Sequence, residues 1–79
     1  PNPTSDILNI VLDENMLDKA VTLTLRDQLG RDVWSRNIQN LETTLVQLNV
    51  REYNLAAGVY TLSLQNDDGL MARQVVVNR

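Results

Sequence analysis

Short runs in which apolar and polar residues alternate recur along the chain, and they restrict the fold more than any other feature. The clearest is "VTLTLR", where Val21, Leu23 and Leu25 alternate with polar residues. A period of two matches a β-strand, whose successive side chains point to opposite faces, whereas a helix repeats every ~3.6 residues. We therefore expect a strand here, with Val21, Leu23 and Leu25 directed into a core.

Other runs of the same kind predict further strands. They cover residues 6–12, 32–38, 60–65 and 71–78. In the first of them Leu8, Ile10 and Leu12 share one face, which we expect to point inward. The run "DVWSRNI" has no clean apolar face. For it we expect Val33 and Ser35 to point inward, with Trp34 covering one side.

Residues 41–55 fit two patterns. Three leucines lie at helical spacing, namely Leu41, Leu45 and Leu48. Four residues lie at strand spacing, namely Thr44, Val46, Leu48 and Val50. The β-branched residues in this segment favour a strand. A single helix remains the alternative.

Turn signals separate these runs. In "DQLGR", Gly30 can adopt the positive φ that closes a short hairpin, and the Asp27 side chain can accept hydrogen bonds from the turn backbone. "NDDG" predicts a second hairpin before the last strand. In the polar stretch "DENMLDK", we expect Leu17 to plug the core under a loop.

Six to seven short strands without a long helix indicate an all-β fold. We expect a small antiparallel β-sandwich with immunoglobulin-like, Greek-key topology. A chain of 79 residues buries enough surface for one core, so residues 6–79 are expected to form one domain. Residues 1–5, with Pro1 and Pro3, read as the end of a linker. The start at proline suggests a C-terminal module cut from a longer polypeptide.

The stretch "NLAAGVYTLSL" is typical of a corner between the two sheets of such a sandwich. A tyrosine near the start of the penultimate strand often donates its hydroxyl hydrogen to the backbone of the preceding corner, and Tyr60 is placed for this. Leu55 would fill the core below the corner. Gly58 would supply a backbone conformation or a close approach that a side chain would block.

The residue types present argue against catalysis. The chain has no histidine and no cysteine, so the usual general base at neutral pH, imidazole metal ligands and thiolates are missing. We expect no enzymatic activity and no cofactor. The net charge of −3 disfavours binding to nucleic acid, and we expect no small-molecule substrate. No apolar run approaches the ~20 residues that span a bilayer.

Two weaker binding hypotheses have structural explanations. Asp13, Glu14 and Asp18, or the "DDG" turn, offer oxygen ligands for calcium, but neither has the spacing of an EF-hand loop. Turn formation and solubility explain them. Three aromatic residues invite comparison with a carbohydrate platform, but they are more often core and corner residues. These are Trp34, Tyr53 and Tyr60.

Four elements, in order, resemble the type A C-terminal sorting domains of the type IX secretion system. They are "PNPTSDILNI", which lacks the tyrosine of the usual opening element, "DQLGRDV", "NLAAGVYTLSL" and "RQVVVNR". Together they span nearly the whole chain. The corner "NVREYN" is a few residues longer than usual, and Gln74 stands where a second lysine is common.

The resemblance implies a secretion signal. In this family a cargo protein reaches the periplasm, the domain presents it to the outer-membrane type IX translocon and its shuttle proteins, and a sortase-like surface peptidase then removes the domain. The cargo is destined for the cell surface or the medium. The alternative, from a different class, is a non-catalytic accessory module that binds glycans or matrix, or spaces an attached enzyme from a surface.

The last strand is the candidate recognition element. At an edge of the sheet, it would expose backbone donors and acceptors that a partner strand can pair with. We expect Val75, Val76 and Val77 to supply side chains and Arg73 and Arg79 to supply charge. Such an edge also allows a dimer. The alternative is that these valines are core residues next to a solvated terminus.

Overall fold

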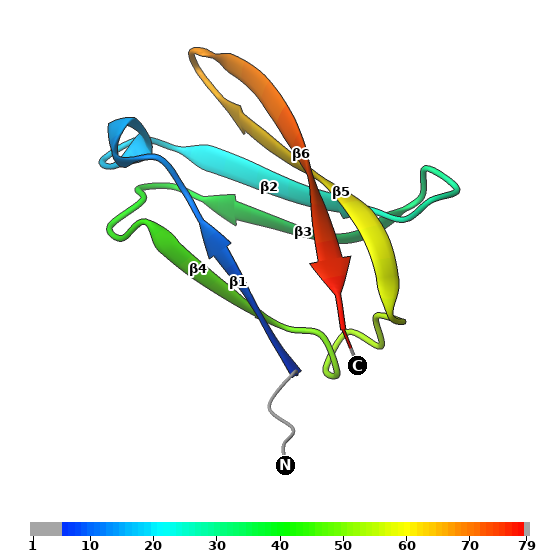
Figure 1. Cartoon of the computed structure of the whole chain (residues 1–79). Coiled ribbons are helices and arrows are strands. Elements are labelled where there is room, and N and C mark those ends of the chain that lie inside the picture. The colour runs from blue at the N-terminus through cyan, green and yellow to red at the C-terminus, as the bar shows by residue number, and fades with distance from the viewer. Residues whose placement is uncertain (1–5, 79) are drawn as a thin grey trace.

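Six strands form two antiparallel sheets in the computed structural model, which describes residues 6–78 (Figure 1). The strands are β1 (Ile7–Val11), β2 (Val21–Arg26), β3 (Asp32–Ile38), β4 (Leu45–Asn49), β5 (Gly58–Asn66) and β6 (Gly69–Val77). A turn of 3₁₀ helix, η2 (Glu14–Met16), follows β1. Within this part of the chain no helix has the length and apolar character needed to cross a membrane.

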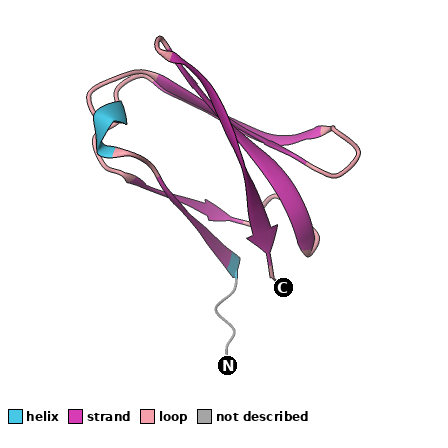
Figure 2. Cartoon of the chain, turned by 45° about the horizontal axis from the view of Figure 1, so that its top comes forward, coloured by secondary structure: helices cyan, strands magenta, loops and turns pink. Residues whose placement is uncertain are grey.

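The two sheets differ in size. One pairs β1 with β4, and the other has the strand order β3-β2-β5-β6. The chain changes sheet after β1, after β3 and after β4, while the hairpins β2–β3 and β5–β6 each stay within the larger sheet. Figure 2 shows the sheets as two layers. The predicted all-β sandwich is confirmed, and its strand order fits an immunoglobulin-like arrangement.

The core lies between the layers and is built from inward positions on every strand. Leu23 and Leu25 of β2 pair with Leu64 and Leu62 of β5, and all four side chains are buried. Residues directly opposite each other in an antiparallel pair share a face of the sheet. The pairing of β2 with β5 therefore places two rows of leucine side chains on one surface, as the alternation in "VTLTLR" predicts.

Residues 41–55 contain a strand and not a helix. Val46, Leu48 and Val50 are buried, whereas Leu45, which shares helical spacing with Leu48, is exposed. β4 pairs antiparallel with β1 along its whole length. The β-branched residues thus lie in the pleated environment that suits them.

The predicted orientation of β3 was wrong for Ser35 and Trp34, whereas Val33 packs against the core as expected. Ser35 is exposed and Val33 half-buried, while the Trp34 side chain, only 6% exposed, points into the core. The reason is the pairing with β2: Trp34 lies opposite Leu25, so it must share the inward face. The register shifts between Leu25 and Arg26, which leaves Val33 as the additional residue of a β-bulge.

Two side chains surround Trp34 at this edge of the sandwich. The guanidinium carbon of Arg36 lies 5.0 Å from the centre of the indole ring. The ring of Tyr53, from the loop between β4 and β5, meets the indole edge-on with ring centres 6.4 Å apart. These contacts close the side of the sandwich between β3 and β4, as expected for cation–π and edge-to-face aromatic pairs.

The loop after β1 buries a different residue from the one predicted. Met16 is buried within the core, whereas Leu17 is half-buried at its margin. The 3₁₀ helix explains this, because its tight turn directs Met16 inward and leaves Leu17 at the helix end. The linker predicted for residues 1–5, with Pro1 and Pro3, lies outside the described residues, and the domain boundary at residue 6 stays a prediction.

Candidate functional site

Strand β6 forms an edge of the larger sheet. It pairs with β5 along its whole length, from the pair of Asn66 with Gly69 at the hairpin to the pair of Gly58 with Val77 at the far end. No other described strand pairs with its second side (Figure 1). Backbone groups alternate along a strand, and the pair that closes a two-residue hairpin is hydrogen-bonded. The N–H and C=O groups of four residues therefore point away from β5. These are Leu70, Ala72, Gln74 and Val76.

The three valines near the end of β6 have different surroundings. Val77 is 3% exposed and belongs to the core, Val75 is half-buried against it, and Val76 is 55% exposed on the outer face. The core interpretation holds for Val77, which anchors the strand, whereas recognition of the exposed Val76 by a partner stays a prediction.

Arg73 connects the open edges of the two sheets. It lies opposite Leu62, whose side chain faces the core, so the Arg73 side chain extends along the inner side of β6. Its Nη2 donates a hydrogen bond to the backbone carbonyl of Val11, at the end of β1. Arg79, predicted to add charge, lies outside the described residues.

The corner before β5 has the geometry expected of a tyrosine corner. The Tyr60 hydroxyl donates a hydrogen bond to the carbonyl oxygen of Ala56 at 2.7 Å, and Tyr60 itself is buried. Leu55 is buried below the corner. Gly58 has φ +152°, and a Cβ built there would meet no atom within 4 Å. Glycine is therefore required for its backbone conformation and not for a close approach.

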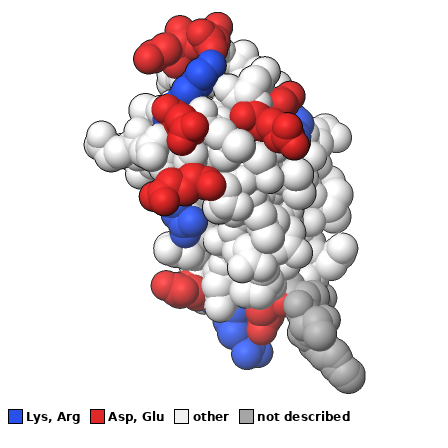
Figure 3. Space-filling model, turned by 90° about the vertical axis from the view of Figure 1, so that its left-hand side faces the viewer, with Lys and Arg blue, Asp and Glu red and all other residues white. Residues whose placement is uncertain are grey.

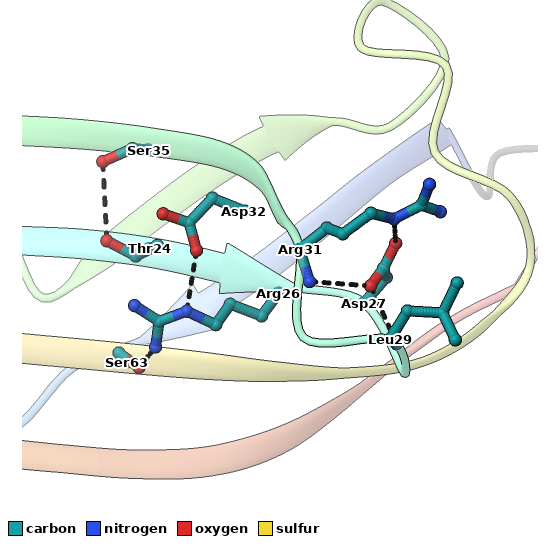
Figure 4. Close-up of polar contacts among 8 residues, drawn as sticks. All are labelled: Thr24, Arg26, Asp27, Leu29, Arg31, Asp32, Ser35 and Ser63. Carbon is teal, nitrogen blue, oxygen red and sulfur yellow. Dashed lines mark hydrogen bonds and ion pairs between the residues drawn. The ribbon is translucent and has the colours of Figure 1, made fainter.

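The turn between β2 and β3 is organised by Asp27 (Figure 4). Its Oδ1 accepts hydrogen bonds from the backbone N–H groups of Leu29 at 2.9 Å and Arg31 at 3.0 Å, and its Oδ2 pairs with Arg31 Nε at 2.8 Å. Gly30 adopts φ +81° within the turn. Hydrogen bonding by the Arg31 backbone amide is the main cause that lowers the pKa of Asp27, with partial burial opposing it.

The acidic and aromatic residues form structural contacts. Asp13 caps the 3₁₀ helix by accepting from the Asn15 amide at 3.2 Å, and Asp68 pairs with Lys19 at 3.0 Å. Within residues 6–78 no group of three or more carboxylate, histidine or cysteine side chains could hold a metal ion. Of the three aromatic residues, Trp34 and Tyr60 are buried and only Tyr53 is exposed, so they do not form a platform.

Sequence reasoning did not find the part that β1 plays at this site. β1 is an edge of the smaller sheet, and it lies on the same side of the sandwich as β6, so that the two open edges are neighbours (Figures 1 and 2). It also missed Met71, which occupies an inward position of β6 but is 58% exposed. Alternation predicts each strand but not which edges meet.

Comparison with known proteins identifies one family. The family described as "Secretion system C-terminal sorting domain" matches residues 1–78. No curated protein and no solved structure matches the chain. The matched range includes the tyrosine corner, the Asp27 turn and the whole of β6.

We predict that Tyr60→Phe lowers the free energy of unfolding by about 0.5–1.5 kcal/mol, because it removes the hydrogen bond from the buried Tyr60 to the Ala56 carbonyl. Tyr53→Phe is the matched control: it removes a hydroxyl from an exposed tyrosine, with an expected change below about 0.5 kcal/mol. Urea unfolding followed by fluorescence measures both. Equal effects would show that the corner hydrogen bond does not stabilise the fold.

We predict that Asp27→Asn lowers the thermal stability at neutral pH and makes it less sensitive to acid. Because the folded state lowers the pKa of Asp27, its contribution is present above the unfolded value of about 4 and is lost as the pH falls through the lower folded value. The gap in melting temperature between wild type and variant should therefore narrow below about pH 4. A gap that stays constant from pH 7 to pH 2 contradicts this role.

Proposed function

Because the chain belongs to the family of secretion system C-terminal sorting domains, we propose that it directs an attached protein through the outer-membrane translocon of a type IX secretion system. The match of the family to residues 1–78 is the observation that carries this proposal. As a type IX sorting domain, the chain is part of a secreted precursor destined for the cell surface or the extracellular space.

The proposed route has three steps. The precursor enters the periplasm and its cargo folds there; the sorting domain is recognised by the translocon and its shuttle proteins; a sortase-like peptidase then cleaves in the linker before the domain. The nucleophile for the cleavage belongs to the peptidase. The lack of histidine and cysteine in this chain supports a role as a signal without catalysis of its own.

The free edge of β6 is the proposed recognition element. A partner strand can pair with the outward backbone groups of β6 and so extend the larger sheet. Val76 would contribute an exposed side chain and Arg73 a charge, while Val75 and Val77 hold the strand on the core. Arg79 would add a second charge after the strand.

The proposal is tested by fusing residues 1–79 to the C-terminus of a periplasmically targeted fluorescent reporter. We expect reporter at the cell surface or in the medium of a host with the type IX machinery, and only in the periplasm of a translocon-deficient strain. Folded, intact reporter held in the periplasm of both strains would contradict the proposal. It would direct attention to a binding or spacing module.

Edge pairing is tested by Gln74→Pro, which removes an N–H that points away from β5. Proline is tolerated at such positions of edge strands, so the melting temperature should stay within several degrees of wild type. Loss of one pairing position should reduce export about tenfold or more. Gln74→Ala is the control, because it removes the side chain and keeps the N–H.

Ala72→Pro repeats this test at a second outward position. Export at the wild-type level in both proline variants, with the fold retained, would show that the translocon does not pair with β6. These variants are sharper than removal of residues 76–79, because that truncation also deletes the buried Val77 and thereby damages the core.

A further inference from the structure

The neighbouring edges of β1 and β6 enclose a groove, which we call the seam. A hollow of about 240 Å³ at one end is lined mainly by apolar side chains and also by Arg73. Its apolar lining is Val11, Leu12, Met16, Leu64 and Met71. A hollow of about 220 Å³ at the other end is lined by Leu8, Val50 and Val77 among others. Arg73, bonded to Val11, lies between Met71 and Val77 along β6 and separates the two hollows.

A strand added to the free edge of β6 would run over the seam. Alternate side chains of that strand would point into it, at the levels of Met71, Arg73, Val75 and Val77. Met71 and Val77 are six residues apart, or about 20 Å in an extended chain, and each lines one hollow. The middle of the seam is occupied by the Arg73 guanidinium.

The charges around the seam favour an acidic occupant. Arg73 is the one charged residue of β6, although the chain as a whole has a net charge of −3. Its guanidinium carries five N–H donors, and one of them is used by Val11. Figure 3 shows several acidic side chains on the side of the molecule to the left in Figure 1. Asp68, which lines a neighbouring hollow with Met71, is paired with Lys19. Asp13, at the rim of the first hollow, caps η2.

We propose that the occupant of the seam is an extended acidic segment of a partner protein. In an antiparallel pairing it has an apolar residue over the second hollow, a carboxylate four positions later against Arg73, and an apolar residue two positions after that over the first hollow. In a parallel pairing the order is reversed. This rests on the edge pairing of the proposed function and adds the sequence that the edge selects.

A second copy of this chain fits the seam less well. In a symmetric antiparallel pairing centred on Arg73, the two guanidinium groups would face each other across the new pair of strands. Like charges directly opposite one another destabilise a sheet. The geometry therefore favours a different chain with the opposite charge.

Disulfide tethering tests the proposal directly on the folded domain. The chain has no cysteine, so Asn78→Cys introduces a unique thiol at the end of β6. The probes are the peptide Cys-Gly-Gly-Leu-Thr-Thr-Thr-Glu-Thr-Leu, the same peptide with Lys for Glu, and both sequences reversed with the cysteine at the C-terminus. Capture at equilibrium under a fixed thiol buffer is measured by mass spectrometry.

We expect the Glu peptide in one orientation to be captured at least about threefold better than its Lys counterpart, which is the effect of a partly exposed ion pair. Arg73→Glu should reverse this preference, whereas Gln28→Glu, which adds a carboxylate at an exposed position of the remote β2–β3 turn, should leave it unchanged. Serine in place of both leucines should lower capture. Equal capture of Glu and Lys peptides, or a preference that survives Arg73→Glu, overturns the proposal.

Two further measurements, sedimentation and reporter export, separate an acidic partner segment from a second copy and separate this proposal from the proposed function. Sedimentation of the wild-type chain as a dimer that Gln74→Pro dissociates, by removing an N–H at the free edge of β6, would assign the seam to a second copy and overturn the proposal. The tethering result does not depend on secretion. If the reporter is not exported but the Glu peptide is captured preferentially, the proposed function fails and the specificity of the seam stands. If the reporter is exported but the Glu peptide is not preferred, the proposed function stands and the specificity of the seam fails.

Discussion

The pairing of β2 with β5 is the interaction on which the rest of the structure depends. It joins the two hairpins of the larger sheet, and its opposed leucines set which face of each strand is buried. Leu25 lies opposite Leu62 on one side and Trp34 on the other, so the inward position of Trp34 follows from β2 and not from β3 itself. Because directly paired residues share a face of the sheet, the inward positions of β5 also direct their partners Arg73 and Val77 of β6 inward.

This dependence explains which features could be predicted from the sequence. In strands with strong alternation, such as β2 and β5, the sequence pattern itself predicts which face is buried. In β4 the β-branched residues correctly favour a strand over a helix. β3 carries a bulge, and a bulge shifts the alternation by one residue in a way that only the partner strand reveals. The same limit applies to the candidate site. The pairing of β6 with β5 follows from the hairpin signal, but the edge position of β6 and its proximity to β1 are set by the strand order and the packing of two sheets.

An open edge is a liability that sandwich proteins must manage. Unpaired N–H and C=O groups invite pairing with any extended chain, and a charged side chain on the edge reduces that risk. Among residues 6–78 the smaller sheet has two strands, and the free edges of β1 and β6 lie on the same side of the sandwich. Arg73 bonds to β1 and places a positive charge in the middle of this opening. A charge that repels unspecific or self-pairing also selects a carboxylate, so protection and recognition can rest on one residue.

The two tasks of β6 are divided between alternate residues. The inward set holds the strand on β5 and the core, with Val77 buried at its end, while the outward set carries the free backbone groups and the exposed Val76. Under the proposed edge pairing, substitutions in the inward set change stability and recognition together, whereas those in the outward set act mainly on recognition. The start of β5 is fixed by the Tyr60 corner, which thereby sets the position of β6 along the sheet. If the signal is the edge of β6, as proposed, it is read only in the folded domain, because that edge exists only after the leucine rows of β2 and β5 have paired.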